Sequence, residues 1–240
     1  ARPRSRLSPD GCRSAPRRPV QALLGGIFAG SPYLRSLALR DLGRLQRILT
    51  SAPDAYFGSL KQDLVAALKS AADMPEAMRL VRRFKNEAAL VSGLADIAGI
   101  WPVMRVTEVL TETADAALQG SVRFLFRQAV AKGDWLSDDG DTPDVGSGYI
   151  VLGMGKHGAF ELNYSSDIDL IVFYEAGLAR LRDGLEPQGF FVRMTRDLVR
   201  LMDERTADGY VFRTDLRLRP DAGATQIALS TDTGAIYYES

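Results

Sequence analysis

Residues 165–174, SSDIDLIVFY, decide how the second half of the chain folds. Side chains alternate between the two faces of a strand, so Asp167 and Asp169 share one face. The opposite face carries the apolar residues Ile168, Leu170 and Val172. At about 3.3 Å per residue the two carboxylates are about 7 Å apart, and each raises the pKa of the other unless a cation lies between them. The stretch therefore predicts a strand with one buried face and one face suited to a metal ion.

A glycine pattern precedes this strand. Gly153, Gly155 and Gly158 follow the apolar run 149–152 and spell G-x-G-x-x-G. A dinucleotide-binding fingerprint needs a helix of about ten residues and a crossover to a parallel strand, but the next strand is predicted only nine residues after the last glycine. A P-loop does not fit either, because Lys156 is followed by a histidine. The pattern predicts a tight turn that faces phosphate, without a dinucleotide.

A further strand is predicted over residues 210–218, where the alternation returns. One face holds Tyr210, Phe212, Thr214, Leu216 and Leu218. The other face holds Arg213, Asp215, Arg217 and Arg219. Taken alone, this charged face is typical of a surface salt-bridge ladder. Next to an Asp-x-Asp strand, a third carboxylate completes a ligand set for two Mg²⁺ ions about 3.5 to 4 Å apart, and nearby arginines suit phosphate oxygens.

The first half of the chain has helical periodicity. Apolar residues recur three and four positions apart from Leu34 to Leu49, from Leu60 to Leu68, and onward to Ala131. We therefore predict an α+β fold, with a helical subdomain over residues 20–132 and a catalytic domain over residues 149–240 that mixes strands with flanking helices. One of these helices is predicted over residues 188–204.

Two segments lack periodicity. Residues 1–19 contain six arginines, four prolines and one acid, and are interpreted as a disordered basic tail rather than an organellar transit peptide. Residues 133–148 are rich in glycine and aspartate and are interpreted as a linker. The linker's acids are Asp138, Asp139, Asp141 and Asp144. They lack the ligand order of an EF-hand, so a solvated loop is favoured over a calcium site.

Composition excludes several classes of protein. Thirty basic and thirty acidic residues give no net charge, which argues against nucleic acid or an anionic membrane as the main partner. The single cysteine, Cys12, rules out an internal disulfide framework and a multi-cysteine zinc site, and fits the cytoplasm. His157 is the only histidine, so a histidine-rich metal site is not supported.

The combined motifs resemble a known family. The stretches LGMGKHGAFELNYSSDIDLIVFYE and GYVFRTDLRLRPDAGAT look like the bifunctional glutamine synthetase adenylyltransferase/adenylyl-removing enzymes, within the nucleotidyltransferase superfamily that has the DNA polymerase β fold. The resemblance is clear from about residue 75 to residue 240. ELNYSSDIDL and VFRTDLRLRP are similar to the N-terminal, adenylyl-removing domain of that family, whereas the adenylylating domain reads closer to MTAASDLDL.

The resemblance implies an activity and its partners. Inorganic phosphate would attack the AMP on a tyrosine of glutamine synthetase and release ADP, with Mg²⁺ as the cofactor. A sister domain would attach AMP from ATP, and the PII nitrogen regulator would set the balance. The adenylylating activity itself, or a non-catalytic regulatory module with the same fold, are the alternatives.

The resemblance also implies roles for individual residues. Asp167 and Asp169 match the family's metal-binding pair, and Asp215 matches the third carboxylate of the superfamily. The residues expected at the nucleotide phosphates are Gly153, Gly155, Lys156, Ser165, Ser166, Arg217 and Arg219, the last two as a hypothesis from their place in the RLRP segment.

Two departures from the family pattern carry expectations of their own. His157 replaces the usual leucine of GKLG and is expected to be a packing substitution rather than a general base. The chain ends at IYYES, where the family continues, so we expect a fragment whose activity alone is in doubt.

Overall fold

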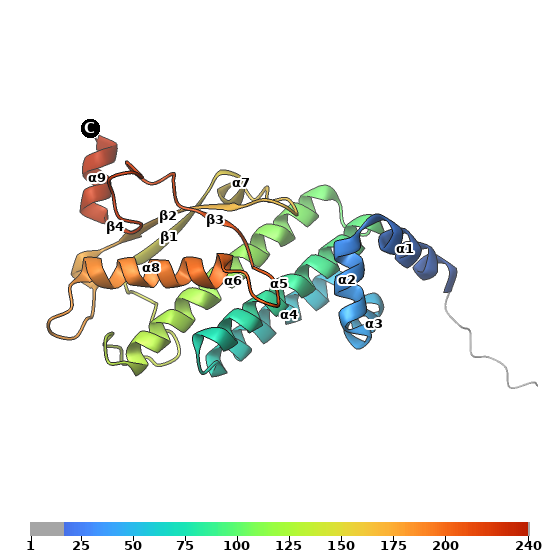
Figure 1. The fold of residues 1–240 in the computed structure, drawn as a ribbon, viewed down its shortest axis with the longest axis horizontal. Coiled ribbons are helices and arrows are strands. Elements are labelled where there is room, and N and C mark those ends of the chain that lie inside the picture. Colours follow the sequence, from blue (N-terminus) through green and yellow to red (C-terminus); the bar gives the residue numbers. More distant parts are fainter. Residues whose placement is uncertain (1–16, 240) are drawn as a thin grey trace, which may run out of the picture.

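Residues 17–239 are described by the computed structural model (Figure 1). Of the predicted basic tail, residues 1–16, including Cys12, lie outside the described part. The tail prediction was too long at its other end, because residues 17–19 already belong to helix α1. The helical half consists of α1 (Arg17–Gly30), α2 (Pro32–Arg40), α3 (Leu42–Thr50), α4 (Pro53–Ser70), α5 (Met74–Ile97) and α6 (Val103–Ala131).

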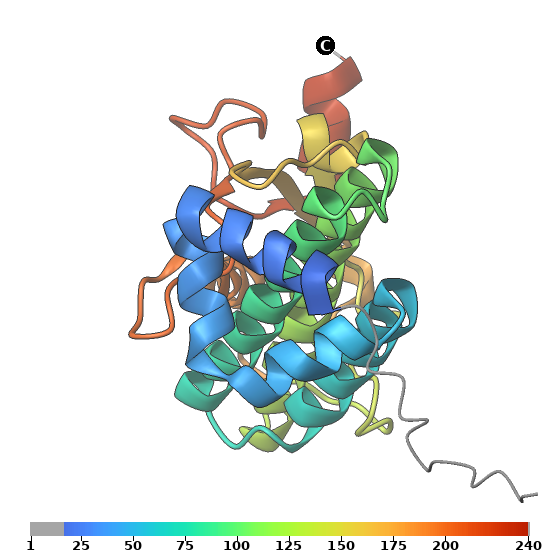
Figure 2. The ribbon, with the colours of Figure 1, turned by 90° about the vertical axis from the view of Figure 1, so that its right-hand side faces the viewer.

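Local sequence signals explain where these helices begin. Ser31, Asp41 and Asp73 are N-cap residues, and each side chain accepts a hydrogen bond from a backbone N–H in the first turn. Pro53 and Pro75 occupy the first helical turn, where a missing N–H costs nothing. Figure 2 shows α1, α2 and α3 lying across one end of the longer helices. None of the helices in the described part, residues 17–239, is long and apolar enough to cross a membrane.

The second half builds a mixed four-stranded sheet. Strand β1 (Tyr149–Met154) pairs antiparallel with β2 (Ile168–Tyr174), and β2 pairs parallel with the short strands β3 (Thr214–Asp215) and β4 (Leu229–Ser230). The remaining elements are α7 (Gly155–Gly158), the 3₁₀ turn η1 (Ala176–Leu178), α8 (Pro187–Asp203) and α9 (Thr231–Glu239). The predicted α+β class, helices first and mixed sheet second, is confirmed.

One hydrophobic core joins the two halves. Helices α6 and α8 pack beneath the sheet (Figure 1), and the predicted inner face of β2 is fully buried. Aromatic rings fill the junction. The ring centroids of Tyr174 on β2 and Phe191 on α8 are 4.8 Å apart, and those of Phe126 on α6 and Trp135 are 4.9 Å apart. Burial of such rings is among the largest contributions to folding free energy. The division into a helical subdomain and a catalytic domain remains a prediction.

The segment between α6 and β1 is more than a solvated linker. Trp135 is 2% exposed, and its indole Nε1 donates to the Pro143 carbonyl at 3.1 Å. Asp144 accepts from the Arg123 guanidinium at 2.9 Å, and Asp139 accepts from two backbone N–H groups of its own loop. These contacts give Asp139 and Asp144 partners within the protein.

The strand predicted over residues 210–218 was too long. The backbone N–H groups of Val211 and Phe212 both donate to the Met202 carbonyl at the end of α8, so they cannot join a strand ladder. Leu218, placed on the mainly apolar face of the predicted strand, is 51% exposed. The chain turns after Asp215, and only Thr214 and Asp215 remain as β3.

Candidate active site

The two sequence motifs meet at one edge of the sheet. Asp169 on β2 lies directly opposite Asp215 on β3, and on its other side it lies opposite Met154, the last residue of β1. Asp167 comes immediately before β2 and is exposed, whereas Asp169 is partly buried. Neighbouring strands are about 4.8 Å apart, so two of the predicted carboxylates are close neighbours.

The electrostatics of these acids differ. Partial burial raises the pKa of Asp169, and the negative charges of Asp167 and Asp215 raise it further. Hydrogen bonds from the Arg217 side chain, followed by one from its backbone N–H, lower the pKa of Asp215. Asp169 therefore carries negative charge that its surroundings do not fully compensate, and Asp215 has a cation beside it.

Arg217 forms an ion pair with the third carboxylate, Asp215. Its Nε lies 3.0 and 2.9 Å from the two oxygens of Asp215, its Nη2 lies 2.5 Å from Oδ2, and its backbone N–H donates to Oδ1 at 2.8 Å. Across residues 17–239, no three acid, histidine or cysteine side chains are gathered tightly enough to form a ready-made metal site. The predicted trio nevertheless fits Mg²⁺ in its chemistry, because it offers hard carboxylate oxygens and Asp169 lacks compensation. Both oxygens of Asp215 accept from Arg217, so a metal ion bound there would compete with this contact.

The turn needs glycines because its backbone lies too close to neighbouring atoms for a side chain to fit. Gly155 has φ +54°, and a Cβ there would lie 2.8 Å from Oδ2 of Asp169, so the turn backbone lies against the carboxylate. A Cβ at Gly158 would lie 2.5 Å from the Gly153 carbonyl oxygen, which closes the turn on itself. Lys156 is exposed within α7. The structure thus brings the predicted turn next to Asp169, as a four-residue helix with no dinucleotide crossover.

His157 lies under this turn. Its ring is 4% exposed, and Nε2 lies 2.8 Å from Oδ1 of Asp115 on α6. A Cβ at Gly153 would lie 3.0 Å from the buried Nδ1 of the ring. These contacts support a packing role, and they connect the turn to the helical half. Asp115 was not predicted, because nothing in the sequence links two residues 42 positions apart.

The predicted serines shape the loop before β2. Ser166 Oγ accepts from the Asn163 N–H at 3.1 Å, and the Ser165 N–H donates to the Asn163 side chain at 3.0 Å. The Ser165 carbonyl accepts from Arg213 Nη2 at 3.1 Å. Arg213 therefore fastens the loop to the start of β3. Contact of the serines with phosphate remains a prediction.

Arg219 lies within its own turn. Its guanidinium donates to the carbonyls of Leu216 at 2.6 Å and Ala222 at 2.8 Å. A phosphate contact by Arg219 would require these bonds to break, whereas the Arg217 side chain is 84% exposed and needs only to leave Asp215. Of the two arginines, Arg217 is the better placed for phosphate.

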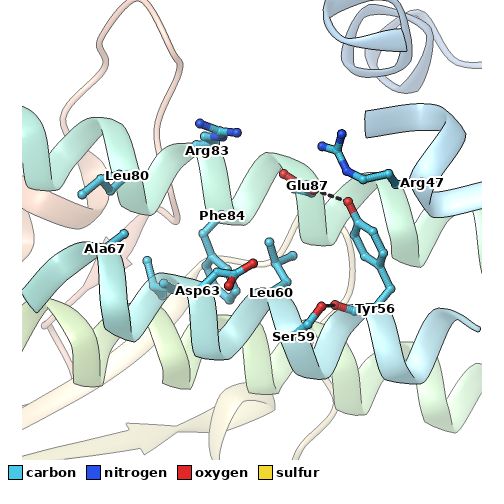
Figure 3. A pocket seen from close by; sticks show the side chains of 11 residues that line it. Arg47, Tyr56, Ser59, Leu60, Asp63, Ala67, Leu80, Arg83, Phe84 and Glu87 are labelled. Carbon is cyan, nitrogen blue, oxygen red and sulfur yellow. Dashed lines mark hydrogen bonds between the residues drawn. The ribbon is translucent and has the colours of Figure 1, made fainter. Parts of the chain in front are cut away.

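A separate hollow of about 410 Å³ lies between α3, α4 and α5 (Figure 3). Two of its polar groups pair with each other, since the Tyr56 hydroxyl donates to the buried Glu87 carboxylate. Burial and this carboxylate raise the pKa of Tyr56 to about 12. The predicted phosphate- and metal-binding residues all lie outside this hollow.

A family model described as Glutamate-ammonia ligase adenylyltransferase matches residues 21–240. The chain belongs to this family. Among its relatives are proteins named bifunctional glutamine synthetase adenylyltransferase/adenylyl-removing enzyme. The relative from Bradyrhizobium diazoefficiens is 49% identical over 90% of this chain, and that from Rhodopseudomonas palustris strain BisB5 is 50% identical over 94%. The relative from Xanthobacter autotrophicus is 45% identical over 99% of this chain.

The match covers only part of each relative. This chain spans 22%, 23% and 24% of the length of these three proteins. The family resemblance predicted from the two motifs is confirmed.

Proposed function

We propose that this chain removes AMP from adenylylated glutamine synthetase by phosphorolysis. Phosphate attacks the phosphorus of the AMP group, the bond from phosphorus to the tyrosine oxygen breaks, and ADP and the free tyrosine are the products. The observation that carries the proposal is the pairing of Asp169 with Asp215 on adjacent strands, with the glycine turn against Asp169.

The residues have distinct parts in this proposal. Asp167, Asp169 and Asp215 would hold Mg²⁺, which neutralises charge on the phosphate groups when bound. The backbone at Gly155 packs close to the Asp169 carboxylate, and in this proposal the turn backbone positions the phosphate. Lys156 and Arg217 supply positive charge, and Arg217 exchanges the Asp215 carboxylate for a phosphate oxygen. The attacking phosphate is already an anion, so His157 need not act as a base.

The wider setting belongs to the same proposal. We infer that a sister domain adenylylates glutamine synthetase with ATP, that PII regulates the balance, and that the protein acts in the cytoplasm. The names of the relatives contain both activities, which supports a bifunctional enzyme and leaves the direction at this site to experiment.

The direction is tested with labelled phosphate. Adenylylated glutamine synthetase, Mg²⁺ and ³²P-phosphate are incubated with the protein, and nucleotides are separated. Labelled ADP is the expected product. Incorporation of AMP from labelled ATP into unmodified synthetase, with no labelled ADP, would instead assign the adenylylating activity to this site. A protein that binds nucleotide and catalyses neither reaction would be a regulatory module.

A further inference from the structure

A larger cavity, about 630 Å³, lies between α2, α5, α6, the loop 163–165 and the segment 210–212. Its wall is mainly apolar and aromatic, and includes Tyr33, Leu34, Ile97, Tyr164, Tyr210 and Phe212. This volume is typical of small-molecule sites, which combine apolar walls with a few polar groups. The cavity is therefore of a size and character to enclose a nucleoside.

The cavity adjoins the acid site. Ser165 lines it and lies two residues before Asp167, a separation of at most about 7.6 Å between Cα atoms. On the other side, Phe212 lines the cavity and is followed by Arg213, whose carbonyl accepts the Ile168 N–H at 2.9 Å. Both walls thus lead to the beginning of β2. A ligand with its phosphate at the aspartates can extend its other end into the cavity.

The polar groups of the cavity suit a nucleoside. Asp96 accepts a hydrogen bond from the Tyr164 hydroxyl at 2.9 Å, and Asn163 lines the same space, with its Oδ1 accepting from the Ser165 N–H at 3.0 Å. Lys85 Nζ lies 3.1 Å from the Tyr33 hydroxyl and 5.4 Å from the ring centroids of Tyr33 and Tyr210. Carboxylate and amide oxygens accept from exocyclic amines and ribose hydroxyls. Aromatic rings stack on the flat faces of bases.

We propose that this cavity binds the purine and ribose of the adenosine nucleotide whose phosphate lies at the aspartates. The proposal rests on the proposed function, because it takes the AMP group as the common part of substrate and product. A tyrosyl side chain of the protein substrate is the rival occupant. It fits less well, because one phenol ring uses little of the cavity volume of about 630 Å³.

Tyr164 offers the sharpest test, because its side chain is 51% exposed and its removal leaves the core intact. Calorimetry on the chain would compare adenosine, ADP, pyrophosphate and Mn²⁺. Tyr164→Ala is expected to weaken the binding of adenosine and ADP by about tenfold or more, because stacking is lost, and to leave the affinities for pyrophosphate and Mn²⁺ unchanged. Tyr164→Phe keeps the ring and should bind within about threefold of wild type. Tyr238→Ala, a 62% exposed tyrosine on α9, is the matched control.

A second variant fills the cavity instead. Ala89 lines it from α5, so Ala89→Trp should exclude adenosine while pyrophosphate still binds. Wild-type adenosine affinity in both Tyr164→Ala and Ala89→Trp would overturn the proposal. An equal loss of pyrophosphate affinity would overturn it as well. So would variants that raise only the KM for adenylylated synthetase, because that result would place the tyrosine of the protein substrate in the cavity.

Failure of the cavity and failure of the proposed function give different results. Labelled ADP formation together with wild-type adenosine binding by both Tyr164→Ala and Ala89→Trp would reject the cavity alone. Adenosine binding that is lost in Tyr164→Ala, together with no labelled ADP from the wild-type protein, would reject phosphorolysis and keep the cavity.

Discussion

Arg82 and Asp169 are charged groups that the fold surrounds in different ways. The Arg82 side chain is fully buried, and its guanidinium donates to the carbonyls of Met78, Leu201, Glu204 and Gly209. Asp169 is only partly buried, and the nearest charges include two further carboxylates. One charge is compensated by the chain itself, whereas the other is held among like charges.

This difference separates structural charge from chemical charge. A buried charge with a full set of hydrogen bonds fixes its surroundings, and here it fastens α5 to the end of α8 and to the turn before β3. A charge without compensation costs stability and leaves room for a cation or a substrate. Three substitutions test whether the comparison holds.

The largest effect is expected from Arg82→Ala. The substitution removes four hydrogen bonds to backbone carbonyls, two of them buried and two part-buried, so the free energy of unfolding should fall by about 4 kcal/mol. Chemical denaturation measures the change. Arg79→Ala is the control on the same helix, because Arg79 is exposed and pairs with Glu76. Loss of less than about 1 kcal/mol in Arg82→Ala would show that the guanidinium is not a structural clamp.

The same contrast explains how far sequence predicts this fold. Strand β2 follows from its alternation, and the N-caps Ser31, Asp41 and Asp73 follow from residue type. The length of β3 does not follow from the sequence. It depends on the Met202 carbonyl, which accepts hydrogen bonds from the N–H groups of Val211 and Phe212. Arg82 is equally hidden, since an arginine within a helix is usually exposed. Contacts between distant segments decided each of these cases.

The site was predictable in part for the same reason. Asp167, Asp169 and the glycine turn are local patterns, and local patterns survive folding. The pairing of Arg217 with Asp215 is also local, yet a strand model places these side chains side by side without predicting a bidentate contact. Tyr164 and Asp96, 68 residues apart, meet only because α5 lies beside the loop before β2.

The second effect in size is expected from Asp169→Asn. Loss of this carboxylate should lower phosphate-dependent ADP release by about a hundredfold or more, because a metal ligand next to the reacting phosphate is lost. Stability should stay the same or rise slightly at neutral pH, since burial and the charges of Asp167 and Asp215 disfavour the ionised form. Turnover and chemical denaturation are measured together.

Asp183→Asn, an exposed acid in the loop before α8, is the control for this substitution. Normal turnover by Asp169→Asn would remove Asp169 from the chemistry. A large loss of stability in Asp169→Asn would show that Asp169, like Arg82, is a charge that stabilises the fold.

The smallest effect concerns an ion-pair network in the helical half. Glu112 accepts hydrogen bonds from Lys61 and from Arg105, the latter at 3.0 Å, and these outweigh the effect of burial and lower its pKa below 4.5. A lowered carboxylate pKa adds stability that is complete above the unfolded value and is lost as the pH falls through the folded value. Glu112→Gln should therefore cost about 1 kcal/mol or less at pH 7, and nothing once the pH is below both values.

The measurement is the free energy of unfolding of wild type and Glu112→Gln from neutral to acidic pH. Glu108→Gln serves for comparison, because Glu108 is more exposed and, among the described residues, pairs with Arg105. A difference between wild type and Glu112→Gln that stays constant with pH would contradict an ion-pair contribution. It would indicate that only the shape of the Glu112 side chain matters, and the helical half would then rely on Arg82 and on its apolar core rather than on paired surface charge.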